Sequence, residues 1–188
     1  MKKSEERVVY IVLTHTGTIP SRLIRIFTRY EYTHVSISLD RNLEHLYSFA
    51  RKAKYNFFNA GFVEENFNTG VYGRLKHVKC KIYKIRLDNK KYERICKILK
   101  KYKNRHYLLR YNFLGILCPV FKKSFSRKNY FFCSQFVTRV LIDSRILKIH
   151  EDPSIISPGV LDKKLSIKTD KVYEGLLKSI DIDKIAIS

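Results

Sequence analysis

Acidic residues are scarce in this chain. Only 17 Asp and Glu stand against 38 Lys and Arg in 188 residues, which gives a formal net charge of +21. Such an excess draws a protein toward phosphate-rich or otherwise anionic surfaces. The basic residues are spread along the chain, however, and no zinc-finger, RNP or P-loop pattern accompanies them. We therefore expect no specific nucleic-acid binding, whereas peripheral contact with an anionic membrane is compatible with the charge.

Cysteine is also rare, and its spacing excludes two classes of site. The four cysteines form no C-x-x-C pair and show no His/Cys ligand spacing. This argues against a structural zinc site and against a dense disulfide framework. We expect no cofactor and no metal, because two isolated ligands such as His34 and Cys133 cannot define a metal site.

Long hydrophobic runs and linkers are absent as well. The apolar run at residues 8–13 is too short to span a membrane, and no small-residue cleavage site follows it. We therefore expect a cytoplasmic location, where thiols stay reduced. No internal repeat or low-complexity linker divides the chain. Its 45% hydrophobic content fits one compact domain over residues 1–188.

Hydrophobic periodicity predicts an α+β fold. A β-branched apolar run at residues 8–13 suits a buried central strand. Further strands are predicted at 44–51, at 78–87 with a β-bulge where the alternation changes phase, and at 171–176. An apolar stripe over residues 92–102 predicts a helix, whereas residues 54–76 show little periodicity and are predicted to form a long loop. Several strands in sequence between helices favour a mostly antiparallel sheet packed with helices on one side.

Two short segments carry candidate catalytic residues. In residues 32–39, alternation separates an apolar face from a polar one that includes His34. In residues 130–137, an aromatic run stops at Cys133, and apolar residues then recur at helical spacing. Cys133 is thus predicted at a helix N-terminus, where free N–H groups and the helix dipole favour a thiolate. Together, the histidine and the cysteine are the two parts that a thiol hydrolase needs.

Each of these residues also has an ordinary structural interpretation. Cys133 could be a buried core cysteine, and His34 could be a surface histidine on an edge strand. The other three cysteines are interpreted as core residues; these are Cys80, Cys96 and Cys118.

The two motifs together resemble a known family. T-H-V-S-I-S on a strand, followed later by F-x-C-S-Q-F-V opening a helix, resembles the circularly permuted NlpC-type cysteine hydrolases, a papain-like family, and in particular the YiiX-like branch of small bacterial proteins. In papain-type chains the cysteine comes first, whereas here His34 precedes Cys133. The resemblance extends over most of the chain, from the strand at residues 8–13 to residues 157–158.

The resemblance implies a permuted papain-like fold and a set of residue roles. Cys133 would be the nucleophile, with its backbone N–H helping to form an oxyanion hole, and His34 would be the general base and then the acid. Family members commonly place a polar residue, often Glu, on the next strand to orient the histidine. Ser48 is the nearest match in this position, and Glu44 is the alternative.

The resulting hypothesis is a cysteine hydrolase or acyltransferase that uses a Cys–His dyad. By resemblance, its substrates would be small peptides or cell-wall fragments with an amide bond, or lipid acyl groups. Two alternatives stay open. One is a non-enzymatic binding module of the same fold that holds an anionic ligand or a membrane surface, and the other is a nucleic-acid-binding protein.

Overall fold

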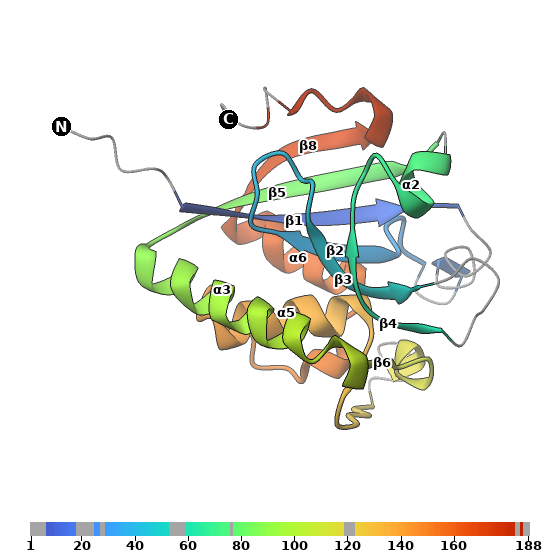
Figure 1. The fold of residues 1–188 in the computed structure, drawn as a ribbon, viewed down its shortest axis with the longest axis vertical. Coiled ribbons are helices and arrows are strands. Elements are labelled where there is room, and N and C mark those ends of the chain that lie inside the picture. Colours follow the sequence, from blue (N-terminus) through green and yellow to red (C-terminus); the bar gives the residue numbers. More distant parts are fainter. Residues whose placement is uncertain are drawn as a thin grey trace.

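The computed structural model describes residues 7–17, 25–26, 29–52, 59–75, 77–118, 123–182 and 185. These residues form an α+β structure around a six-stranded sheet with the order β4-β3-β2-β1-β5-β8, in which every pairing is antiparallel (Figure 1). Its strands are β1 (Arg7–His15), β2 (His34–Ser38), β3 (Leu46–Arg51), β4 (Ala60–Glu65), β5 (Lys79–Leu87) and β8 (Asp170–Leu176). Two short strands, β6 (Arg110–Tyr111) and β7 (Tyr130–Phe131), form a separate parallel pair.

Most helices gather on one side of the sheet. Figure 1 shows helices lying together along one face of the strands, and their buried side chains belong to one core. The helices are α2 (Gly70–Arg74), α3 (Asn89–Asn104), α5 (Cys133–Asp143) and α6 (Pro158–Lys168), with 3-10 turns η1 (His106–Leu108), η2 (Leu114–Leu117), η3 (Pro153–Ile155) and η4 (Leu177–Ser179). Local signals fix where the longer helices begin. The Asp88 carboxylate accepts a hydrogen bond from the Lys91 N–H at the start of α3, and the Ser157 hydroxyl accepts from the Val160 N–H at the start of α6.

Strand β1 is the central strand, as its apolar run predicts, and it lies between β2 and β5. Side chains alternate across a strand, so β1 contributes to two separate cores. Val9, Ile11 and Leu13 pack toward the helices, and Tyr10 and Val12 pack on the opposite face. Because both faces are covered, the run is continuously apolar rather than alternating.

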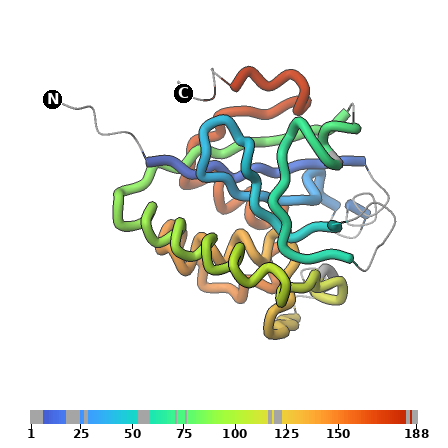
Figure 2. The backbone as a smooth tube through the Cα atoms, viewed as in Figure 1, coloured from blue at the N-terminus to red at the C-terminus, as the bar shows by residue number. Residues whose placement is uncertain are grey.

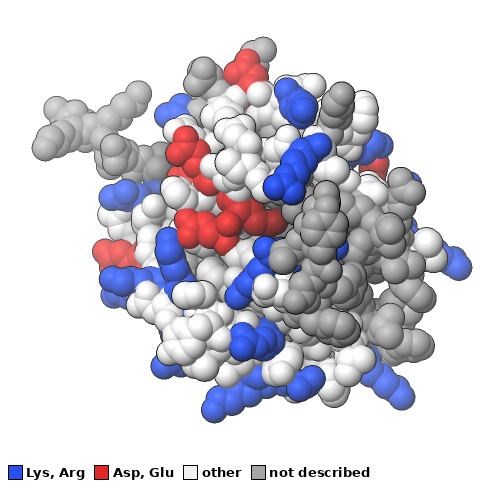
Figure 3. Space-filling model, turned by 45° about the vertical axis from the view of Figure 1, so that its right-hand side comes forward, with Lys and Arg blue, Asp and Glu red and all other residues white. Residues whose placement is uncertain are grey.

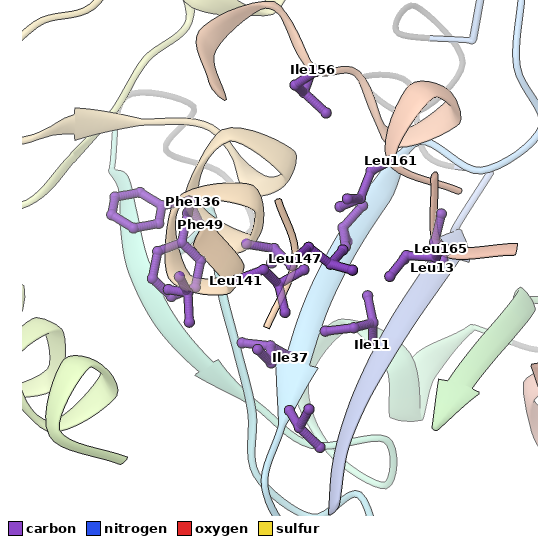
Figure 4. Packing of buried hydrophobic residues seen from close by; sticks show 14 of the residues in the cluster. Ile11, Leu13, Ile37, Phe49, Phe136, Leu141, Leu147, Ile156, Leu161 and Leu165 are labelled. Atoms are coloured by element: carbon purple, nitrogen blue, oxygen red, sulfur yellow. The ribbon is translucent and has the colours of Figure 1, made fainter. Parts of the chain in front are cut away.

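The larger core joins the sheet to α5. Phe136 of α5 is fully buried, and its ring centroid lies 5.2 Å from that of Phe49 of β3 and 5.7 Å from that of Phe62 of β4. Figure 4 shows Phe136 and Phe49 side by side, with Ile37 of β2 nearby. These contacts pack α5 against the strands, and this packing fixes the position of the first residue of the helix.

The opposite face of the sheet carries a second, smaller core. Leu46 of β3 and Ile82 of β5 are fully buried there, together with Tyr72 of α2 and Leu177 of η4. The prediction of helices on one side therefore holds for α3, α5 and α6, whereas α2 covers the other face.

Four further predictions of secondary structure are confirmed. Strand β3 falls within residues 44–51, and α3 includes the predicted stripe at 92–102. Strand β5 pairs with β8 near the predicted residues 171–176, and the two lie side by side in Figure 2. Their register shifts between Ile82 and Tyr83, where the change of phase predicts a bulge.

The prediction of a long loop at residues 54–76 is wrong over its described part. Residues 59–75 contain β4 and α2, and β4 forms an edge of the main sheet. Alternation in β4 is short and interrupted by Gly61 and by two adjacent glutamates, so local periodicity is weak. Pairing with β3 supplies the order that the local sequence does not show.

In the described part of the chain, no helix combines the length and apolar character needed to cross a lipid bilayer.

Candidate active site

Cys133 is the first residue of α5, as the sequence predicts. The chain enters the helix from β7, and the side-chain oxygen of Gln135 accepts a hydrogen bond from the Phe132 N–H at 3.3 Å. The hydroxyl of Ser134, the residue after Cys133, donates to the Ile156 carbonyl at 2.8 Å. This hydrogen bond connects the first turn of α5 to the residue that follows η3. Since a helix leaves its first N–H groups without partners inside the helix, this turn is an electropositive position for a sulfur atom.

His34 is the first residue of β2, which lies between β1 and β3. The alternative of a surface histidine on an edge strand is therefore excluded. Its side chain is 17% exposed. Val35 and Ile37, which have the opposite phase, pack into the larger core, as the alternation predicts. The polar face of β2 is also buried, because Ser36 and Ser38 are inaccessible to solvent.

The His34 imidazole has a carboxylate partner, Glu65, at the end of β4. Glu65 Oε2 lies 3.0 Å from His34 Nε2, and the Glu65 side chain is 16% exposed. A buried histidine next to a carboxylate is held in one orientation, and its protonated form is stabilised.

The protonation of His34 depends on its neighbours. Burial by itself would lower the pKa of the imidazole, but the Glu65 carboxylate and the Cys133 sulfur raise it to about 10. Burial would likewise raise the pKa of Glu65, but the charge and hydrogen bond of His34 and the hydrogen bond from Ser48 lower it below its ordinary value. An imidazolium facing a carboxylate is therefore the favoured state near neutral pH. Cys133 lies within electrostatic reach of that imidazolium.

Ser48 lies in the same network but contacts a different residue from the one expected. Its hydroxyl donates to Glu65 Oε2 at 2.5 Å, so it holds the partner of His34. Glu44, the alternative third residue, precedes β3 and is exposed; its backbone N–H donates to Asp40, and its carbonyl accepts from Asn66. The structure thus brings together His34, Ser48 and Glu65, and leaves the Glu44 carboxylate outside this network.

Two tyrosines complete the surroundings of the sulfur. Tyr72 of α2 is buried, and its hydroxyl lies 3.1 Å from that of Thr14. Burial and the Glu65 carboxylate raise its pKa well above the ordinary value. Burial and Cys133 do the same for Tyr111 of β6. Both phenols are therefore neutral at neutral pH, and the charge of Cys133 contributes to the raised pKa of each.

The other three cysteines differ from Cys133 in their surroundings. Burial raises the pKa of Cys80 to about 12, and it also raises the pKa of Cys96 and of Cys118. These thiols are protonated at neutral pH. Cys80 and Cys118 are buried, which agrees with their interpretation as core residues, whereas Cys96 is only partly buried.

Metal ligation has no candidate in the described ranges. No group of three or more His, Cys, Asp or Glu side chains there is placed to hold a metal ion.

Sequence reasoning missed Glu65, Tyr72 and Tyr111. All three come from segments with weak periodicity, and two lie in the predicted loop at 54–76. One signal was present in the sequence. Two adjacent glutamates follow an apolar residue in a chain that is poor in acidic residues, which marks Glu64 and Glu65 as unusual.

Comparison of the chain with protein-family models, with curated proteins and with solved structures gave no match in any of the three.

Proposed function

We propose that this protein is a cysteine hydrolase or acyltransferase of the permuted papain-like type, with Cys133 as nucleophile, His34 as base and acid, and Glu65 as the residue that orients His34. One observation carries the proposal. A partly buried histidine, with its Nε2 at 3.0 Å from a carboxylate oxygen, has its pKa raised to about 10 by that carboxylate and by a cysteine at a helix N-terminus.

The reaction begins with the sulfur of Cys133. Its thiolate, paired with the His34 imidazolium, attacks the carbonyl carbon of an amide, ester or thioester. The C–S bond forms as the carbonyl π electrons move to oxygen. The backbone N–H of Cys133 lies at the start of α5, where the helix dipole favours this negative charge.

Collapse of this intermediate expels the amine, alcohol or thiol, which takes its proton from His34. An acyl group then remains on Cys133. Neutral His34 accepts a proton from water or from another acceptor as that acceptor attacks the acyl carbon, and breakage of the C–S bond restores the thiolate. Glu65 stays ionised and holds the imidazole in place throughout.

The substrate class follows from the resemblance of the motifs. Peptide-type amides, including cell-wall fragments, come first and lipid acyl groups second. The chemistry requires only an activated carbonyl, so the residues of the network do not distinguish between these substrates.

Cysteine alkylation by iodoacetamide, followed for each cysteine by mass spectrometry, tests the proposal. Cys133 is 3% exposed, which makes a small reagent necessary. At pH 7 we expect Cys133 to react faster than Cys80, Cys96 and Cys118, and this advantage to be lost in H34A. The matched control is H45A, because His45 contacts Glu64 in a similar pair on the surface at 2.6 Å.

Two results would contradict the proposal. One is Cys133 labelling no faster than that of Cys96 in the folded protein. The other is an equal effect of H34A and H45A. Either result would favour the alternative of a non-enzymatic binding module.

A further inference from the structure

The longest stretch of the chain without Asp or Glu lies between Glu93 and Asp143. Its Lys and Arg residues lie within 94–110 and 122–128, followed by Arg139. This stretch forms most of α3, then η1, β6, η2, β7 and most of α5. In Figure 3 the lowest part of the molecule shows Lys and Arg side chains, and the visible Asp and Glu side chains lie higher.

The same stretch exposes large apolar side chains. Exposed fractions of 61%, 47%, 64% and 42% are found for Tyr107, Leu108, Leu114 and Phe125. Monomeric proteins rarely leave several such side chains together on their surface unless the surface binds something.

These side chains come from two segments that Asn112 holds together. The Asn112 side chain accepts a hydrogen bond from the Gly115 N–H at 2.9 Å and donates to the Phe125 carbonyl at 3.4 Å. Arg110 donates to the Tyr107 carbonyl at 2.8 Å. The hydrogen bonds of Asn112 thus hold the segments of Leu114 and Phe125 together, and Tyr107 and Leu108 lie in η1, which leads into β6 directly before Asn112.

Cations accompany the apolar side chains on this surface. Arg110, Arg127 and Lys128 are exposed. No carboxylate in the described part of the chain forms an ion pair with them. The Arg127 guanidinium lies over the Tyr130 ring, 3.9 Å from its centroid. A contact with an acidic residue is made by the Ser124 hydroxyl, which donates to Asp152 at 2.8 Å.

We propose that this apolar–basic surface, made of Tyr107, Leu108, Arg110, Leu114, Phe125, Arg127 and Lys128, binds an anionic lipid bilayer. The exposed leucine and aromatic side chains enter the interface between headgroups and acyl chains, and the cations contact lipid phosphates. Both components are needed, because a single small apolar anchor holds a protein at a membrane only weakly. Exposed leucines favour a bilayer over a nucleic acid, which offers them no apolar phase.

The surface lies close to the candidate active site. Arg110 directly precedes Tyr111, whose phenol is influenced by Cys133, and β6 pairs with the strand that leads into α5. Docking would bring this end of α5 to the membrane. The docking itself does not depend on the proposed function, because no residue of the surface belongs to the catalytic network.

Vesicle co-sedimentation of the full chain tests the inference. We expect binding to vesicles of phosphatidylcholine with one-third phosphatidylglycerol, and little binding to phosphatidylcholine alone. The charge variant R127Q/K128Q should weaken binding roughly thirtyfold, since each cation near an anionic surface contributes about 1 kcal/mol. The apolar variant L114S/F125S should weaken it as well.

The matched control removes similar side chains elsewhere. Ile167 of α6 is 81% exposed and is flanked by the exposed Lys163 and Lys168, so I167S and K163Q/K168Q should leave binding unchanged. C133A should bind as the wild type does, which separates this result from that of the alkylation experiment. Circular dichroism verifies that each variant is folded.

Three outcomes would overturn the proposal. The first is an absence of vesicle binding by the folded wild type. The second is equal loss in surface and control variants, which would mean that diffuse charge drives binding. The third is unchanged vesicle binding in L114S/F125S with tight binding to RNA, which would make the surface a polyanion site.

Discussion

Glu65 Oε2 lies 3.0 Å from His34 Nε2, although the two residues belong to strands that are not neighbours in the sheet. Strand β3 runs between them and contributes Ser48, whose hydroxyl donates to the same carboxylate oxygen. Three strands therefore supply one partly buried polar network. Ser36 and Ser38 have the same phase as His34, and they are buried because this face of the sheet carries the second core, which includes Tyr72 of α2.

The pKa of His34 should depend on Glu65. We expect E65Q to lower it from about 10 toward or below the ordinary 6.5, because burial alone lowers it and the Glu65 carboxylate is the main group that raises it. Histidine titration by NMR measures this value. The control is E64Q, since Glu64 pairs with His45 and Lys103 instead. An unchanged His34 pKa in E65Q would show that the carboxylate does not act on the imidazole.

The contribution of this pair to the free energy of unfolding should fall both at high pH and at low pH. The pKa of His34 is raised, so its contribution is full below its ordinary value of 6.5 and is lost as pH rises toward 10. The pKa of Glu65 is lowered, so its contribution is present above its ordinary value of 4.5 and is lost as pH falls below it. The difference in the free energy of unfolding between wild type and E65Q should therefore be greatest between pH 4.5 and pH 6.5, the ordinary pKa values of Glu65 and His34.

Urea unfolding followed by circular dichroism at several pH values measures this difference, because the chain has no tryptophan for a fluorescence signal. A difference that stays constant from pH 4 to pH 10 would contradict the coupling between the two groups.

A second buried network should contribute to stability without taking part in the site. The Asp162 carboxylate of α6 accepts hydrogen bonds from the hydroxyls of Tyr83, at 2.7 Å, and Tyr30, and it pairs with Lys81 at 3.1 Å. D162N should lower the free energy of unfolding by about 2 kcal/mol, because it removes the charged acceptor of two tyrosine hydroxyls and one of the two carboxylates that pair with Lys81.

The control for this variant is D170N, which breaks the exposed pair with Arg86 and should change the free energy of unfolding by about 0.5 kcal/mol or less. Urea unfolding compares the two variants. Equal losses would mean that the Asp162 network does not anchor α6. Cys133 alkylation should persist in folded D162N, since none of these residues contacts the His34 network.

Strong local patterns were enough to predict much of the framework. The apolar run of β1, the alternation around His34 and the helical spacing after Cys133 are set by neighbouring residues, so they are visible in the sequence. The bulge in β5 was visible for the same reason, because a change of phase is a local feature.

The sequence by itself thus determined that a histidine lies on the polar face of a strand whose other face is apolar, and that a cysteine begins a helix. Only the tertiary structure decided which side chain meets the histidine. Ser48 is near His34 in sequence and has the expected phase, but Glu65 reaches the imidazole because β4 pairs with β3, and Ser48 then binds Glu65. Strand pairing depends on contacts between distant segments, and a short strand such as β4 carries little local signal, so no pattern within residues 60–65 could reveal that contact.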